Sequence, residues 1–96
     1  MKLVMVVYSG SRPQTVTRLL ESHAVRGWTE LGGAHGAGTS GRHEATRAWP
    51  GDAAVFFSIV DAARADELAT ALEAEAAGLP AGERLHAAVM PVDRFF

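Results

Sequence analysis

The chain has 96 residues, of which 48% are hydrophobic and 21% are charged, and its formal net charge is −2 at pH 7. The slight negative charge excludes a nucleic-acid binder that works by neutralising phosphates, and the absence of cysteine excludes a disulfide scaffold, a thiolate nucleophile and a cysteine-based zinc or iron–sulfur site. The length fits one domain, and a chain this short buries only about 60–65% of its unfolded surface, so oligomerisation is an early expectation.

No apolar run in the sequence approaches the roughly 18 residues that span a membrane. The opening stretch MKLVMVVYSG is too short for a secretion signal followed by a cleavage site, and it fits a first β-strand better. We therefore expect a cytoplasmic protein that is not inserted into a membrane.

The first half of the chain predicts a strand, a helix and a second strand. Residues 2–8 (KLVMVVY) are continuously apolar and rich in β-branched side chains, which predicts a strand buried on both faces. Ser11 and Gln14 have the spacing of a capping box, and the apolar residues that follow recur at helical intervals, so a helix is expected over 12–25. The stretch 28–36 (WTELGGAHG) has mixed polarity, which is typical of a more exposed strand.

The second half begins with a stretch that has no periodicity. Residues 36–52 are rich in glycine, serine, histidine and arginine and predict a long loop, which in so small a domain is usually functional. Regular structure returns with AAVFFSIVD (53–61), a second strand that is apolar on both faces. Residues 62–78 are rich in alanine, leucine and glutamate and end in glycine, which predicts a helix, and RLHAAVMPV (84–92) predicts a last strand.

This order of strands and helices predicts a ferredoxin-like βαββαβ fold, a single α+β domain over 1–96. In that fold two helices cover one face of a four-stranded antiparallel sheet and leave the other face bare. The two central strands, 2–8 and 53–61, are apolar on both faces, so the bare face would expose a large apolar patch. We predict that copies of the chain bury these faces against one another, and the pattern leaves dimer and trimer open.

The glycine-rich stretch contains GAGTSG (36–41), a literal match to the G-x-G-x-x-G of dinucleotide-binding folds, with Asp61 at the distance of the required acid. Too few residues separate Gly41 from the next strand for a crossover helix, so we reject this interpretation. Arg42 and Arg47 suit an anionic ligand that glycine amides also hold, and the alternative is a loop whose charges only aid solubility.

Several segments resemble the PII signal-transduction proteins. Gly27-Trp28-Thr29, His35-Gly36-Ala37-Gly38 and Gly41-Arg42-His43 are similar to the G-x-T, G-x-G and G-H-like elements around the second strand and T-loop of that family, and Val89-Met90-Pro91-Val92-Asp93 resembles its last core strand. The resemblance implies a non-enzymatic regulator that forms a compact homotrimer and binds a small effector, in this family an adenine nucleotide, in clefts between subunits. It also implies a partner, a membrane transporter or an enzyme, which the T-loop would contact.

The resemblance also points to particular residues. Thr29 matches the threonine of G-x-T, and residues 79–84 take the place of the family's lysine-rich second loop, with Arg84 as their one cation. Trp49 would wall the cleft and stack on a ligand ring, and the alternative is a tight turn in which it covers the sheet edge. With a T-loop-like segment at about 36–51, the expected ligand-binding residues are Thr29, Gly36, Ala37, Gly38, Arg42, Arg47, Trp49 and Arg84.

The sequence leaves two other functions open. A metal-binding trimer of the CutA-like kind would use His35 or His43, which are otherwise solvated loop residues. A dimeric α+β barrel enzyme would pack similar sheets together around a polar pocket, for which His23 is the only candidate. The cofactor is therefore open between an adenine nucleotide, which is favoured, and a metal ion.

Overall fold

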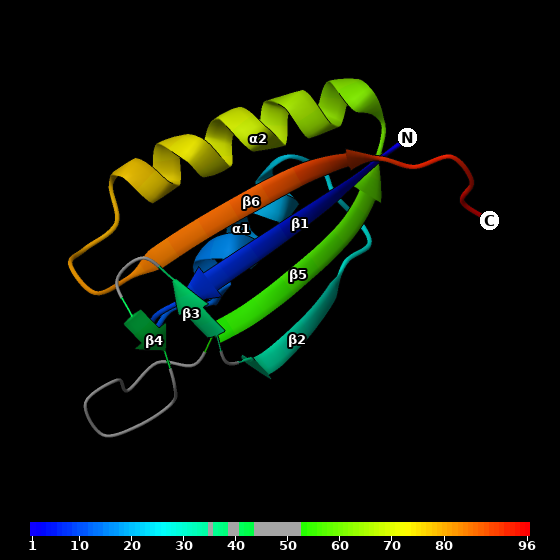
Figure 1. Ribbon diagram of the computed structural model, residues 1–96. Coiled ribbons are helices and arrows are strands. Elements are labelled where there is room, and N and C mark those ends of the chain that lie inside the picture. The colour runs from blue at the N-terminus through cyan, green and yellow to red at the C-terminus, as the bar shows by residue number, and fades with distance from the viewer. Residues whose placement is uncertain (35, 39–40, 44–52) are drawn as a thin grey trace.

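The computed structural model describes residues 1–34, 36–38, 41–43 and 53–96. Its elements are β1 (Lys2–Ser9), α1 (Gln14–Ser22), β2 (Thr29–Ala34), β3 (Gly36–Gly38), β4 (Gly41–His43), β5 (Ala53–Val60), α2 (Ala62–Ala77) and β6 (Arg84–Pro91). Four strands form an antiparallel sheet in the order β2-β5-β1-β6, and β3 pairs with β4 in a separate hairpin. In Figure 1, α1 lies behind the sheet, α2 runs along β6, and the hairpin lies near the end of β1.

The predicted ferredoxin-like α+β fold is confirmed. The two strands that are apolar on both faces, β1 and β5, are the central strands, and β2 and β6 are the edges. Pro91 ends the edge strand β6, where a residue without a backbone N–H does least harm to the ladder. In the part of the chain that is described, no helix is long and apolar enough to cross a membrane.

The predicted capping box at the start of α1 is wrong, and the helix is shorter than expected. Pro13 occupies the N-cap position, no side chain caps the helix there, and the helix covers Gln14–Ser22. It ends early because Ala24 adopts a left-handed backbone with a φ of 58°, which turns the chain out of the helix. The N–H of Val25 then bonds back to the carbonyl of Leu20 at 2.9 Å.

The predicted loop over 36–52 is wrong in its first part. Gly36–Gly38 pairs antiparallel with Gly41–His43, and Gly38 stands opposite Gly41, so the glycine-rich stretch contains two short paired strands, β3 and β4. The motif therefore does not form the strand-to-helix turn of a dinucleotide-binding unit, and residues 44–52 of the predicted loop lie outside the described part of the chain.

The core lies between the helices and one face of the sheet. Alternate residues of β1 and β5 point toward the helices and are almost completely buried, as a period of two in a half-covered sheet requires. Both helices contribute apolar side chains to the same layer. The core consists of Val4, Val6, Tyr8, Val16, Leu20, Val25, Ala54, Phe56, Val60, Ala65, Leu68, Leu72 and Leu85.

The opposite face of the sheet, which Figure 1 turns toward the viewer, is also apolar. Its central side chains are partly exposed, and those nearer the edges are more so: Leu31 is 54% exposed and Met90 is 37% exposed. The prediction that the central strands are apolar on both sides is confirmed. This bare face consists of Leu3, Met5, Val7, Leu31, Val55, Phe57, Ile59 and Met90, as the register of the four strands shows.

The one tyrosine of the chain ties together three segments at the end of β1. Tyr8 has no exposed surface, and its hydroxyl donates to Oε1 of Glu83 at 2.5 Å and accepts the backbone N–H of Arg12 at 3.0 Å. Burial, with the hydrogen bond to the Glu83 carboxylate as the second cause, raises the pKa of the Tyr8 phenol above its ordinary value of 10.0.

This raised pKa predicts a loss of stability in alkali. The folded chain holds the phenol proton more tightly than the unfolded chain, so the contribution of Tyr8 is constant below about pH 10 and falls as the pH rises through the raised pKa. Tyr8→Phe should remove this slope from the free energy of unfolding. Urea denaturation between about pH 8 and pH 11 measures the difference, and a wild-type curve with the same slope as the variant would contradict the prediction.

Candidate functional site

An open cleft of about 820 Å³ lies at the end of the sheet where β1 begins. The cleft exists because β2 begins only at Thr29, which pairs with Phe57. The last residues of β5, 58–60, therefore extend beyond the first residue of β2 and have no partner on that side in the described part of the chain. The chain that leads into β2 is fixed to this edge by Ser58, whose hydroxyl donates to the carbonyl of Gly27 at 2.7 Å. Ser58 is only 5% exposed, so the hydrogen bond is well protected from water.

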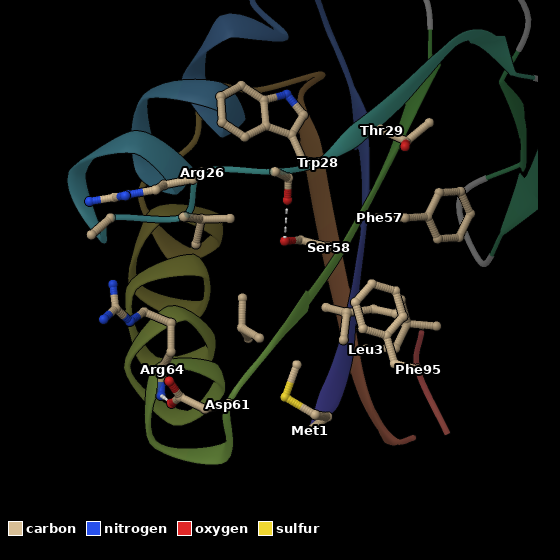
Figure 2. Close-up of a pocket in the computed structure, with 15 residues that line it drawn as sticks. Met1, Leu3, Arg26, Trp28, Thr29, Phe57, Ser58, Asp61, Arg64 and Phe95 are labelled. Atoms are coloured by element: carbon tan, nitrogen blue, oxygen red, sulfur yellow. Dashed lines mark hydrogen bonds between the residues drawn. The ribbon is translucent and has the colours of Figure 1, made fainter. Parts of the chain in front are cut away.

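The walls of the cleft are mainly apolar and aromatic. Figure 2 shows Phe57, Phe95 and Leu3 on one side of the sheet edge and the indole of Trp28 on the other. Trp28 is half-buried against the core, whereas Phe95 is 62% exposed. Such a cleft suits a flat, partly apolar ligand such as a purine ring.

Positive charge lies on the helix side of the cleft. Arg26 is exposed, and Arg64 donates from Nη1 to the carbonyl of His23, which ties the start of α2 to the end of α1 (Figure 2). Asp61, which stands at the distance of the acid in a dinucleotide fingerprint, instead caps α2 by accepting the backbone N–H of Arg64 at 2.7 Å. Two arginines beside one carboxylate that is used as a helix cap leave this rim favourable to an anion.

Of the expected ligand-binding residues that the structure describes, only Thr29 lines this cleft. The glycine residues lie at the other end of the sheet, where Gly36–Gly38 forms β3 and Arg42 stands in β4 opposite Ala37. The strand that was expected over 28–36 is β2, which ends at Ala34, and Gly36–Gly38 forms a separate strand that pairs with β4.

Arg84 lies on the opposite edge of the sheet from Thr29. It is the first residue of β6 and pairs with Ser9 at the end of β1, so it shares the hairpin end of the sheet with β3. The residue is half-buried, and its Nε is buried without a hydrogen-bond partner among residues 1–34, 36–38, 41–43 and 53–96. Buried donors are normally paired, so this atom points to an acceptor that the described residues do not supply.

The candidates for metal binding gain no support from the described residues. His43 belongs to β4 opposite Gly36, and His35 lies outside the described part of the chain, as do Arg47 and Trp49. Among residues 1–34, 36–38, 41–43 and 53–96, no group of three or more histidine, aspartate or glutamate side chains could hold a metal ion. The metal site remains a prediction.

Several residues of the cleft were not expected from the sequence. Ser58 interrupts an apolar strand, which is a readable signal that a buried hydroxyl has a partner. Arg64 follows Asp61 by three residues, the spacing of an N-cap and the N–H that it accepts. Phe95 reaches the cleft only because the chain after β6 returns beside Met1, where the N–H of Val92 bonds to the Met1 carbonyl at 3.2 Å, and no local pattern predicts that.

No family model matches the sequence, and no curated protein matches it either. The fold does match solved structures. CPII, a nitrogen regulatory PII-like protein from Thiomonas intermedia K12 bound to ADP, AMP and bicarbonate, is 18% identical with a TM-score of 0.74 over 97% of this chain and 88% of CPII. The apo form of CPII is 14% identical with a TM-score of 0.65 over 95% of this chain and 89% of CPII.

A second protein with the same fold comes from Thermus thermophilus and is described as a PII-like signaling protein. It is 20% identical to this chain with a TM-score of 0.65, and the match covers 92% of this chain and 82% of that one. These matches cover at least 92% of this chain and at least 82% of the other chain in each comparison. The chain therefore has the PII-like fold, as the scattered glycines and the last strand suggested.

Proposed function

With the PII-like fold as the premise, we propose that the chain is a non-enzymatic signalling protein that forms homotrimers and binds a small anionic effector between its copies. The observation that carries this proposal is the agreement in fold, over 97% of the chain, with CPII bound to ADP, AMP and bicarbonate. ADP and AMP are therefore the leading candidates for the effector. Binding would change how the segment 36–51 contacts a partner protein, a membrane transporter or an enzyme.

The positions of Thr29 and Arg84 support a site shared between copies. Thr29 lies on the edge strand β2 and Arg84 on the edge strand β6, with two strands between them. Neighbouring strands are about 4.8 Å apart, so the two edges are about 14 Å apart within one chain. In a ring of copies that meet edge to edge, β2 of one copy would lie beside β6 of the next. Thr29 is level with Met5 and Arg84 with Ser9, so the two residues would then flank one groove between copies, four strand positions apart.

The bare face supports the closure of such a ring. Eight apolar side chains from four strands make a patch of the kind that soluble proteins bury in an interface. If the β2 edge of each copy meets the β6 edge of the next copy, the ring closes and no sheet edge is left free. Three copies would turn their bare faces toward a common centre.

The chemistry of the two regions fits the two ends of a nucleotide. The aromatic cleft beside Thr29 suits a purine ring, while Arg84 of a neighbouring copy would supply a phosphate with positive charge and with an Nε donor that no described residue uses. Arg42 and Arg47 are proposed to add charge at the hairpin end, and Trp49 to stack on the ligand. The backbone of Gly36–Gly38 is proposed to approach the phosphates, since glycine allows close contact.

A thermal-shift screen with ADP, AMP, bicarbonate, 2-oxoglutarate and divalent metal ions tests the proposal. An effector at about a hundred times its dissociation constant adds about 2.7 kcal/mol to the free energy of unfolding, which is a clear shift for a domain of this size. We expect that shift with ADP or AMP, and a smaller one in Arg84→Gln. Absence of a shift with every adenine nucleotide would contradict the nucleotide site. A shift with metal ions alone, lost in the double variant His35→Ala/His43→Ala, would favour the metal-binding alternative instead.

A further inference from the structure

A second cluster of polar side chains lies at the hairpin end of the sheet, on the helix side of β1. The buried hydroxyl of Tyr8 bridges two chain segments: it accepts the backbone N–H of Arg12 at 3.0 Å and donates to the carboxylate of Glu83 at 2.5 Å. The other carboxylate oxygen of Glu83 lies 3.2 Å from Nη2 of Arg12. We call these three residues the tyrosine clamp.

The clamp holds the residue immediately before β6 in one place. The side chain of Glu83 is only 12% exposed, and both of its oxygens are used. Its backbone is fixed as well, because its N–H bonds to the carbonyl of Pro80 at 3.1 Å in a turn that passes through Gly82 at a φ of 87°. A carboxylate that accepts from a phenol and a guanidinium is held by charge-assisted hydrogen bonds, the strong kind.

The next residue, Arg84, extends from the opposite side of the strand. Leu85 pairs with Tyr8 and faces the helices, so alternation places Arg84, which pairs with Ser9, on the bare-face side. The clamp thus holds the backbone from the helix side, while the guanidinium of Arg84 extends from the bare-face side. The Nε of Arg84 is buried, and no residue of the described part of the chain accepts its N–H, so this donor is available to an acceptor from outside that part.

We propose that Tyr8 and Glu83 are positioning residues, which hold Arg84 in the orientation that binds the anionic group of the effector. This inference rests on the proposed function for the effector and adds the means by which one cation is preorganised. A side chain that is already in place loses less conformational freedom when it binds, so its hydrogen bonds yield more affinity. The clamp joins residues that are 75 positions apart in the sequence, and neither Tyr8 nor Glu83 lines the cleft beside Thr29.

Titration calorimetry with ADP and with adenosine tests the proposal. Tyr8→Phe keeps the ring in the core and removes the hydroxyl, and Glu83→Gln keeps the shape of the side chain and removes its charge. We expect both variants to bind ADP about tenfold more weakly, which corresponds to the loss of one charge-assisted hydrogen bond, and to bind adenosine, which has no phosphate, as the wild type does. Glu73→Gln, an exposed acid on α2, is the matched control and should leave both affinities unchanged.

NMR relaxation of the Arg84 Nε–H group in the free protein tests the role of the clamp independently of effector binding. The wild type should show an ordered Arg84 side chain, and Tyr8→Phe and Glu83→Gln a more mobile one. If the wild type fails to bind ADP, the proposed function fails while this measurement still tests the clamp. Equal order of Arg84 in all three proteins, or ADP affinity that is lost in Arg84→Gln but kept in both clamp variants, would overturn the inference. Arg12→Gln, at a side chain that is 55% exposed, serves if either clamp variant does not fold.

Discussion

Replacing Gly10 with alanine is expected to lower the free energy of unfolding by about 3 kcal/mol. A Cβ atom there would lie 2.5 Å from the hydroxyl oxygen of Tyr8 and 2.9 Å from Cγ of Glu83, closer than real Cβ contacts come. The backbone φ of 154° is also one that residues with side chains rarely adopt. Tyr8 cannot move aside without giving up its hydrogen bonds to Arg12 and Glu83. Urea denaturation at a fixed protein concentration measures the loss.

Gly78→Ala is the matched control for this prediction. Gly78 follows α2 at a φ of −103°, and a Cβ atom there would lie 3.9 Å from the nearest atom, the carbonyl oxygen of Ala74. The substitution should change the stability by less than about 1 kcal/mol, with stabilisation favoured because the unfolded chain becomes stiffer. A Gly10→Ala protein as stable as Gly78→Ala would mean that the end of β1 is not packed as described.

Phe56→Ala should have the larger of the two effects, a loss of about 3–5 kcal/mol in the free energy of unfolding. Phe56 is 1% exposed at the centre of β5 and is among the largest side chains of the core. Truncation removes its buried surface and leaves a cavity between the sheet and the helices. The loss is measured by urea denaturation at one protein concentration, since assembly contributes to the apparent stability.

The neighbouring residue provides the contrast. Phe57 points to the bare face and is only partly buried in the single chain, so Phe57→Ala should destabilise that chain much less than Phe56→Ala. Its effect should instead appear in self-association, as a lower assembly mass upon dilution. If Phe57→Ala unfolds the chain as readily as Phe56→Ala and leaves the assembly mass unchanged, the bare face is not an interface.

The fold could be predicted because its signals are local. Two apolar runs rich in valine, isoleucine and phenylalanine mark the central strands, and the alanine- and leucine-rich run between Asp61 and Gly78 marks α2, whose ends the structure places at those two residues. The apolar character of every position along these strands also predicted that both faces of the central pair are apolar. The strand order then follows from the βαββαβ sequence of elements.

What could not be predicted depends on contacts between distant segments. Nothing near Tyr8 indicates that its hydroxyl meets Glu83, and nothing near Phe95 indicates that it turns back toward Leu3. The early end of α1 also escaped prediction, because a left-handed alanine at Ala24 has no propensity signal. The hairpin in the glycine-rich stretch was missed because three-residue strands of mostly glycine show no hydrophobic alternation.

The candidate site was predictable only in part for the same reason. Thr29 was reached through its resemblance to a family motif, and it does line the cleft. Its separation from Arg84 by the width of the sheet could be seen only once the strand order was known. That separation is the reason for placing the effector between copies of the chain.

The mass of the purified protein in solution tests the central claim, that copies of this chain bury their bare faces and complete one another's sites. Light scattering on a size-exclusion column, with ADP present and absent, gives the mass directly. We predict a particle of three times the chain mass of 10.1 kDa in both conditions. A monomer at micromolar concentration would leave the bare face exposed and Thr29 and Arg84 apart, and would contradict the account; a dimer would favour the α+β barrel arrangement over the ring.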